Sequence, residues 1–367
     1  MNEKTTIPFA PKQKTNMKKP DERLTKKREK RTSESARLRY WVQWVVFTVT
    51  IGIGIQFFIY VHQAFLDGPI RVMRPPAVEG FLPIGALMGW KLFLLTGIWD
   101  AVHPAAMVIL GYAGFASLML RKSFCGWFCP VGTVSERLWK LGRRFLGDNF
   151  IVPFWLDIPL RSLKYLLLGF FAWVILKMPT EAIHAFLQSP YYRISDVKML
   201  FFFTRMSMTT AVVLTILVLL SLPIRNFWCR YLCPYGALMG LLALVGPTRI
   251  VRNSQICIDC ERCAKACPYH LPVDKKECVL SPECNGCMDC TLACPVNKTL
   301  EMKTKGMGKR VWSLAKLGTL LVIVFVGLVY TARITGHWKS SVTDQEFRMR
   351  LKEVDSPHYV HPGIKRK

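Results

Sequence analysis

The chain has 367 residues, of which 51% are hydrophobic, and a formal net charge of +26 at pH 7. Its apolar residues are gathered in long runs, which argues against a soluble globular protein and for an integral membrane protein. The positive charge flanks these runs, as the positive-inside rule expects, and no groove-reading motif accompanies it, so we expect no binding of nucleic acid. Most of the 13 cysteines are two or three residues apart, a pattern typical of reduced metal ligands rather than of disulfides.

The apolar runs predict five membrane crossings. Residues 1–40 are polar and basic, and we expect a disordered cytoplasmic tail there. The segment 81–99 is apolar but carries Pro83, two glycines and Lys91, so we expect it to be re-entrant or interfacial rather than a crossing. The predicted crossings are 41–62, 101–120, 162–178, 206–224 and 311–330.

Five crossings place the N-terminus and every cysteine on the cytoplasmic side of a bacterial inner membrane. The loops 121–161 and 225–310 then lie inside, with seven and 13 Lys or Arg residues, whereas the outer loops 63–101 and 179–205 carry three each. The C-terminal residues 333–367 are then extracytoplasmic, although they are also basic.

The expected fold class is an all-α membrane protein with a small α+β segment of the bacterial two-cluster ferredoxin type. It has about five transmembrane helices and one re-entrant or interfacial segment. The expected parts are a tail (1–40), a membrane domain (41–250), a ferredoxin domain (251–305), the last transmembrane helix (306–332) and a polar extracytoplasmic tail (333–367).

Two cysteine runs carry the strongest chemical signal. Residues 257–268 read CIDCERCAKACP and residues 284–295 read CNGCMDCTLACP, so both follow C-x2-C-x2-C-x3-C-P. In such runs three thiolates hold one 4Fe–4S cluster, and the fourth cysteine binds the other cluster. Cys278 belongs to neither run. We assign Cys257, Cys260, Cys263 and Cys294 to one 4Fe–4S cluster, and Cys284, Cys287, Cys290 and Cys267 to the other.

A shorter motif, C-x3-C-P, follows two of the apolar runs. It reads CGWFCPVG from residue 125 and CRYLCPYG from residue 229, which indicates an internal duplication with parallel copies. The proline suits the first turn of a helix, and the cysteine before it then lies at the N-cap, where a thiolate is favoured. Four such thiols can hold a third iron–sulfur cluster, a copper ion or two reversible disulfides. The four are Cys125, Cys129, Cys229 and Cys233.

These motifs, followed by a two-cluster ferredoxin segment, resemble the membrane polyferredoxins of the NapH, NosR and CcoG type. The stretch from RPPAVEGF to FCGWFCPVGTVSERLW looks most like the YccM branch, and the likeness covers roughly residues 40–330. The resemblance implies electron transfer between membrane quinol and a partner redox protein, and in some relatives copper reduction. The chain is too short for the flavin-binding domain of the NosR type or the C-terminal β-domain of the CcoG type.

A quinone site needs a protonatable group at membrane depth. Asp100 and His103 lie together at the start of a predicted crossing, with Glu181 and His184 in a second outer segment. The alternative interpretation is a helix-capping aspartate beside interfacial histidines.

The sequence therefore predicts an iron–sulfur electron-transfer protein, a component of a quinol dehydrogenase-like oxidoreductase system. It would pass electrons between the quinone pool, or a partner redox protein, and the cytoplasmic clusters. Besides membrane lipid we expect a redox partner protein or quinone as its partner. Two alternatives remain open: a copper reductase or assembly factor for a respiratory metalloenzyme, and an iron–sulfur redox sensor.

Overall fold

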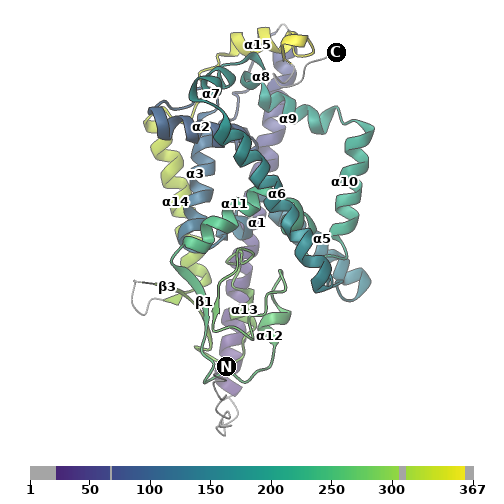
Figure 1. The fold of residues 1–367 in the computed structure, drawn as a ribbon, viewed down its shortest axis with the longest axis vertical. Helices are drawn as coiled ribbons and strands as arrows, with labels where there is room; N and C mark the ends of the chain where they lie inside the picture. Colours follow the sequence, from purple (N-terminus) through teal and green to yellow (C-terminus); the bar gives the residue numbers. More distant parts are fainter. Residues whose placement is uncertain (1–21, 67, 306–310, 360–367) are drawn as a thin grey trace, which may run out of the picture.

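The fold is that of a computed structural model, which describes residues 22–66, 68–305 and 311–359, with the backbone alone over 22–36. Most of these residues are helical, and one small antiparallel sheet lies at one end of the molecule (Figure 1). The combination of apolar helices with a small sheet agrees with the predicted fold class.

Three described helices are long and apolar enough to cross a membrane: α1 (Glu22–Phe65), α6 (Phe154–Lys177) and α14 (Leu314–Ile334). A fourth crossing results if α9 (Ser195–Thr204) and α10 (Met208–Ser221), which bend by 75°, act as one. The predicted count of five is not confirmed. Two of the five predicted crossings contain helices that are too short to cross alone. α3 (Pro104–Leu120) has 17 residues, about 25 Å of helix, whereas a hydrocarbon core is about 30 Å thick. α10 has only 14 residues.

The segment expected to be re-entrant contains α2 (Pro83–Thr96). This helix begins at a proline and ends at Gly97, whose φ of 76° few other residues adopt. Its 14 residues span about 21 Å, which is too short for a crossing. In Figure 1, α2 lies near the end of the molecule that also holds α7 (Thr180–Leu187) and α15 (Asp344–Lys352).

The remaining helical segments are short, apart from α5 and α11. They are η1 (Pro76–Phe81), α4 (Ser123–Trp127), α5 (Pro130–Leu146), α8 (Pro190–Arg193), η2 (Trp228–Leu232), α11 (Pro234–Val245), α12 (Arg262–Lys265), α13 (Asp289–Ala293) and η3 (Pro357–Tyr359).

The sheet has four antiparallel strands in the order β2-β1-β3-β4. At its centre, Ile250 of β1 lies opposite Val279 of β2 and Met302 of β3, and all three side chains are buried. The sheet extends a few residues beyond the predicted ferredoxin segment (251–305) at both ends. The strands are β1 (Thr248–Arg252), β2 (Cys278–Val279), β3 (Leu300–Thr304) and β4 (Val311–Trp312).

The N-terminal segment differs from the expected disordered tail. Residues 1–21 lie outside the described part of the chain, but α1 already begins at Glu22. Residues 22–40 are rich in glutamate, lysine, arginine and leucine, which lose little side-chain entropy in a helix. The first apolar crossing therefore continues a charged helix.

The described residues form two large buried cores toward opposite ends of the long helices and a small third cluster of Ala105, Ala332 and Trp338. One joins α3, α11 and α14 to the sheet and the cysteine-bearing segments. The other lies near the C-terminus, where Phe347 of α15 packs on the ring of Tyr60 of α1, and Asp344 accepts a hydrogen bond from the Tyr60 hydroxyl at 2.7 Å. The polar C-terminal segment is thus folded as a cap as far as Tyr359.

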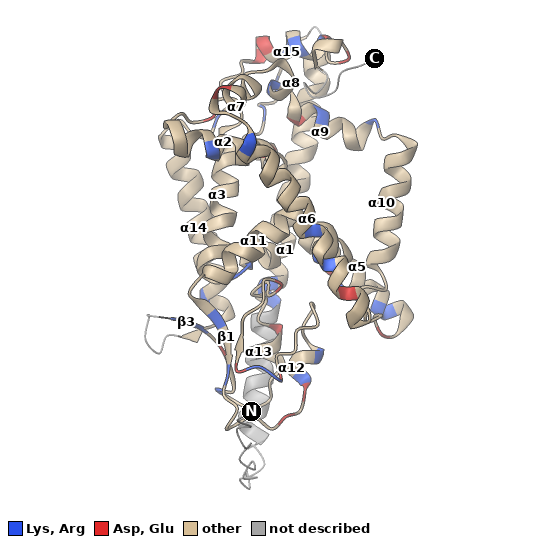
Figure 2. Ribbon diagram, in the orientation of Figure 1, with Lys and Arg blue, Asp and Glu red and all other residues tan. Residues whose placement is uncertain are grey.

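Charged side chains lie mainly toward the two ends of the molecule. In Figure 2, α3, α10 and α14 are free of coloured residues along their middles, and Lys and Arg gather near both ends of the molecule. Residues exposed along the middles, such as Val212 and Ile216 of α10 and Ile323 of α14, are apolar. An apolar belt between two charged ends is typical of a membrane protein.

Candidate functional site

The eight cysteines of the two ferredoxin runs line two separate cavities. The first cavity is lined by Cys267, Cys284, Cys287 and Cys290. The second is lined by Cys257, Cys260, Cys263 and Cys294. Each cavity therefore has three cysteines from one run and one from the other, which is the grouping that the spacing predicts.

The two runs share an unusual backbone conformation. The residues on either side of the second cysteine have positive φ in both: Asp259 (48°) and Glu261 (57°) in the first run, Gly286 (63°) and Met288 (60°) in the second. Left-handed residues curl the chain so that successive thiols face one centre. A short helix, α12 or α13, then holds the third cysteine and separates it from the fourth.

The walls of the first cavity suit an iron–sulfur cluster. Besides thiols they are mainly apolar: Ile250, Leu271, Val273 and Val279 line the cavity and are buried. In the described residues, no three His, Cys, Asp or Glu side chains come close enough together to hold a single metal ion. An apolar cavity lined by four thiols fits an iron–sulfur cluster.

Both C-x3-C-P motifs form the same turn. Cys129 is the N-cap of α5 and Cys233 the N-cap of α11, with the proline as the first helical residue, which confirms the predicted helix starts. The Cys233 sulfur accepts a hydrogen bond from the Gly236 N–H at 3.2 Å. The glycine of C-P-x-G has a steric role in the first copy, since a Cβ on Gly132 would lie 2.5 Å from the Cys125 carbonyl oxygen.

The structure brings the four thiols of these two motifs together. Cys125, Cys129, Cys229 and Cys233 are half-buried and interact electrostatically with one another. Burial raises the pKa of the Cys129 thiol to about 11, against hydrogen bonds from the Gly132 and Val131 backbone. A thiol in such surroundings becomes a thiolate most readily by binding a cation.

The first C-x3-C-P turn also contacts the loop of the first cavity. A Cβ on Gly126 would lie 2.7 Å from the carbonyl oxygen of Asn285, and the Trp127 indole N–H donates to the Gly286 carbonyl at 3.4 Å. Asn285 lines the first cavity. The four-thiol group and the first cavity are therefore neighbours.

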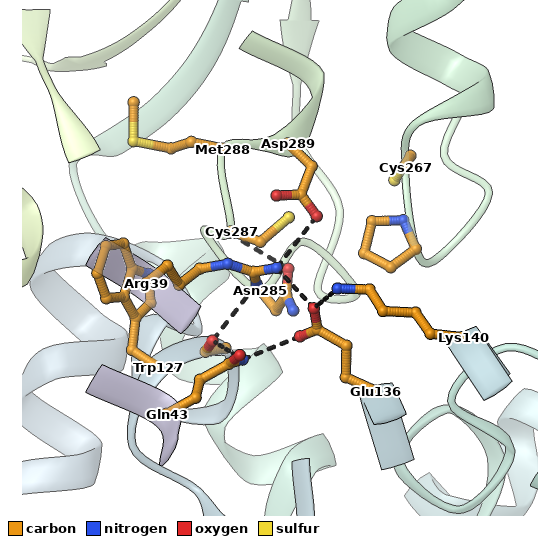
Figure 3. A network of polar contacts seen from close by, with 12 residues as sticks. Arg39, Gln43, Trp127, Glu136, Lys140, Cys267, Asn285, Cys287, Met288 and Asp289 are labelled. Atoms are coloured by element: carbon orange, nitrogen blue, oxygen red, sulfur yellow. Dashed lines mark hydrogen bonds and ion pairs between the residues drawn. The ribbon is translucent and has the colours of Figure 1, made fainter. Parts of the chain in front are cut away.

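A polar network on α1 holds this contact (Figure 3). The Arg39 guanidinium lies 2.8 Å from Glu136 of α5 and 3.3 Å from Asp289 of the cavity loop. Gln43 donates to the Gly126 carbonyl at 3.0 Å and to Glu136 at 2.9 Å. Burial opposes the charge on Glu136, but Arg39 and Lys140 together hold the pKa of this carboxyl at about 2.

Sequence reasoning missed this network because Arg39 fell in the segment expected to be a disordered tail. The only signal was an arginine and a glutamine, Arg39 and Gln43, four residues apart at the edge of an apolar run. That spacing places both side chains on one face of a helix.

The residues predicted for a quinone site lie at the other end of the molecule and are buried. The side chain of Asp100 is 3% exposed and that of His103 is 0% exposed. Asp100 accepts from the Tyr192 hydroxyl at 2.6 Å and from the Val102 N–H at 2.9 Å, so it also caps a turn. The His103 Nε2 lies 2.8 Å from the Tyr192 carbonyl oxygen, which can only accept, so this nitrogen carries a hydrogen.

The remaining candidates at that end are placed differently. His103 Nδ1 faces the buried Glu79 carboxylate at 3.4 Å. Glu181 and His184 of α7 are exposed and do not join Asp100 and His103 in one polar group. The structure therefore brings together only Asp100 and His103 of the four.

Comparison with known proteins identifies relatives. YccM of Escherichia coli K12, which is named as a candidate electron transport protein, is 44% identical over 317 residues, covering 85% of this chain and 89% of YccM. The chain belongs to the YccM family. At lower sequence identity, this YccM-family chain is also similar to the regulatory protein NosR of Pseudomonas aeruginosa and the ferredoxin-type protein NapH of Haemophilus influenzae.

The likeness to NosR and NapH is partial. NosR is 30% identical over 209 residues, which cover 55% of this chain but 27% of NosR. NapH is 28% identical over 210 residues, which cover 55% of this chain and 67% of NapH. No solved structure matches the YccM-family chain.

A protein-family profile described as "4Fe-4S binding domain" matches residues 102–147 and 206–252 of the YccM-family chain. These ranges contain the two C-x3-C-P motifs and stop before Cys257, the first cysteine of the ferredoxin runs. The chain is thus a member of an iron–sulfur electron-transport family, and the family profile centres on its four-thiol group.

Proposed function

We propose that the chain is an inner-membrane electron carrier between the quinone pool, or a partner redox protein, and two 4Fe–4S clusters at its cytoplasmic end. The observation that carries this proposal is the crossed grouping of eight cysteines around two cavities. When bound, 4Fe–4S clusters take up and release single electrons.

The proposed ligands are divided between the cavities. The chain's own contribution is to exclude water from the first cavity with buried residues of the sheet and of the segment after Cys267, such as Ile250 and Leu271. The proposed cluster ligands are Cys267, Cys284, Cys287 and Cys290 in the first cavity, and Cys257, Cys260, Cys263 and Cys294 in the second.

The four-thiol group is proposed as a third redox centre, held by Cys125, Cys129, Cys229 and Cys233. Two observations support it: the family profile for 4Fe–4S binding covers both motifs, and the group adjoins the first cavity through Gly126 and Asn285. The description of that profile favours an iron–sulfur cluster over copper here. The copper-reductase interpretation is therefore the weaker of the two.

The proposed orientation places the cysteines in the cytoplasm and the α15 cap outside. The counts of basic residues in the loops support it, because the loops on the cysteine side carry seven and 13. Asp100 and His103 then lie near the outer surface, where a quinol would release its protons. A quinone reaches these buried groups only if Tyr192, which contacts both, moves aside.

The quinone link is tested on the anaerobically purified chain in lipid vesicles. A short-chain quinol should bleach the iron–sulfur absorption, and Asp100→Asn, which keeps an acceptor for the Val102 N–H, should slow this bleaching about tenfold. Dithionite should bleach both proteins equally. Bleaching by dithionite but not by quinol would refute the quinone link and leave a partner protein as the donor.

A further inference from the structure

Lys122 is a buried lysine whose ammonium group makes no hydrogen bond to any described residue. The residue is 1% exposed. The nearest carboxylate oxygen belongs to Glu283, 3.8 Å away, and the ammonium lies 5.4 Å from the ring centre of Tyr269. A buried ammonium that lacks a close partner is costly, so a negative charge is expected near it.

Glu283 cannot supply that charge alone, because it is already paired. Both of its carboxylate oxygens accept from Lys164, at 2.7 and 2.6 Å, and the Tyr165 hydroxyl donates to it at 3.0 Å. Lys164 is 0% exposed. This buried group therefore holds two ammonium groups and one carboxylate.

The charges on neighbouring elements do not restore the balance. Arg161 and Arg230 share a single carboxylate, Asp157. Arg121 of the same turn as Lys122 donates to the carbonyl oxygens of Ala243 and Ser281. The charged side chains named around Lys122 thus comprise five cations, itself included, and two carboxylates, Glu283 and Asp157.

On its remaining side Lys122 faces the four-thiol group. Its carbonyl accepts from the Cys125 N–H at 3.2 Å, so it begins the turn that holds the first thiol. Its ammonium acts electrostatically on Cys125, Cys229 and Cys233. Neutral thiols would not balance this charge, whereas metal-bound thiolates carry more negative charge than an iron–sulfur core neutralises.

We infer that Lys122 is the charge-compensating residue of an anionic metal–thiolate centre held by Cys125, Cys129, Cys229 and Cys233. This inference rests on the proposed third centre and adds how the chain tunes it. One electron enters the centre from a partner redox protein, which is oxidised by one electron, or from a quinol, which also releases a proton to water, and no bond forms or breaks at the centre itself. Because the added electron increases the negative charge, the adjacent ammonium stabilises the reduced state and raises the reduction potential of the centre.

The test is a redox titration, followed by electron paramagnetic resonance, of the anaerobically purified full chain and four variants. Lys122→Met removes the charge and keeps most of the volume, and Lys122→Arg keeps the charge. Lys177→Met makes the same change at an exposed lysine at the C-terminal end of α6. Cys125→Ser with Cys229→Ser identifies the signal of the third centre by its loss.

At the potential where the wild-type third centre is half reduced, Lys122→Met should lower its reduced-to-oxidised ratio about tenfold. Lys122→Arg should restore most of that ratio, and Lys177→Met should not change it. The other two centres should titrate as in the wild type. A shift confined to the cluster of the first cavity, which Tyr269 lines, would overturn the assignment to the four-thiol centre.

Two further outcomes separate this inference from the proposed function. An unchanged potential, with the third centre present, would overturn the role of Lys122 alone. A wild-type chain with only two centres would overturn the third centre itself.

Loss of iron in Lys122→Met but not in Lys122→Arg would support charge compensation. Equal loss of iron in both variants would assign Lys122 a packing role and overturn the inference.

Discussion

The guanidinium of Arg39, on the first membrane helix, lies 3.3 Å from the carboxylate of Asp289, 250 residues later in the chain. Asp289 stands two residues after Cys287, which lines the first cavity. The same guanidinium lies 2.8 Å from Glu136 on α5, the helix that begins at Cys129. One side chain thus joins the first helix to both cysteine-bearing parts of the molecule.

Arg39→Met should destabilise the protein by about 3–5 kcal/mol, because it leaves Glu136 buried without its main partner. The measurement is the free energy of unfolding of the detergent-solubilised chain in a denaturant titration. Arg37→Met is the matched control, since Arg37 is exposed on the same helix and should change stability by no more than about 0.5 kcal/mol. Equal effects of the two changes would contradict the role given to Arg39.

Glu136 should make stability depend on pH in acid. Its folded-state pKa of about 2 lies below its ordinary value of 4.5, so its contribution is complete above about pH 4.5 and is lost as pH falls toward 2. The difference in apparent melting temperature between wild type and Glu136→Gln should therefore be constant from pH 7 to 5.5 and smaller at pH 3.5. A difference that grows in acid would contradict this sign.

The crossed cysteine grouping predicts how double substitutions combine. Cys267→Ser with Cys290→Ser removes two residues of the same cavity and should cost one cluster, about four irons per chain. Cys263→Ser with Cys290→Ser affects both cavities and should cost about eight. Iron analysis of the anaerobically purified variants measures this. A loss of about eight irons in both double variants would show that each run binds a cluster by itself.

Cys278 should report the side of the membrane that holds the sheet. It is exposed on β2, an edge strand, and lines neither of the two described cavities. A membrane-impermeant maleimide should label it in inverted vesicles and not in intact spheroplasts, and Cys278→Ser should abolish the labelling without loss of iron. Labelling in intact spheroplasts would reverse the proposed orientation.

Spacing rules predicted the local parts of the site. Proline after cysteine fixed the starts of α5 and α11, because proline lacks the N–H that a first helical residue does not need. The exchange of the fourth cysteines between the runs also follows from local sequence, since each short helix carries its last cysteine away from the other three. The segment that contains α2 was set apart from the crossings by Pro83, two early glycines and Lys91.

The contacts between these parts were beyond sequence reasoning. Arg39 and Asp289, or Lys164 and Glu283, are charged residues far apart in the chain, and many other partners were equally compatible with the sequence. The C-terminal cap was likewise hidden, because Phe347 and Leu351 are two apolar residues in a polar segment, too few to signal a buried face. Only tertiary packing selects such pairs.

The central claim is that the chain holds two ferredoxin clusters and a third centre between its duplicated motifs. The most direct measurement is iron and acid-labile sulfide per chain after anaerobic purification, for the wild type and for Cys125→Ser with Cys229→Ser. About twelve irons are expected in the wild type and about eight in the variant. About eight irons in both proteins would contradict it and leave the four thiols without an iron–sulfur cluster.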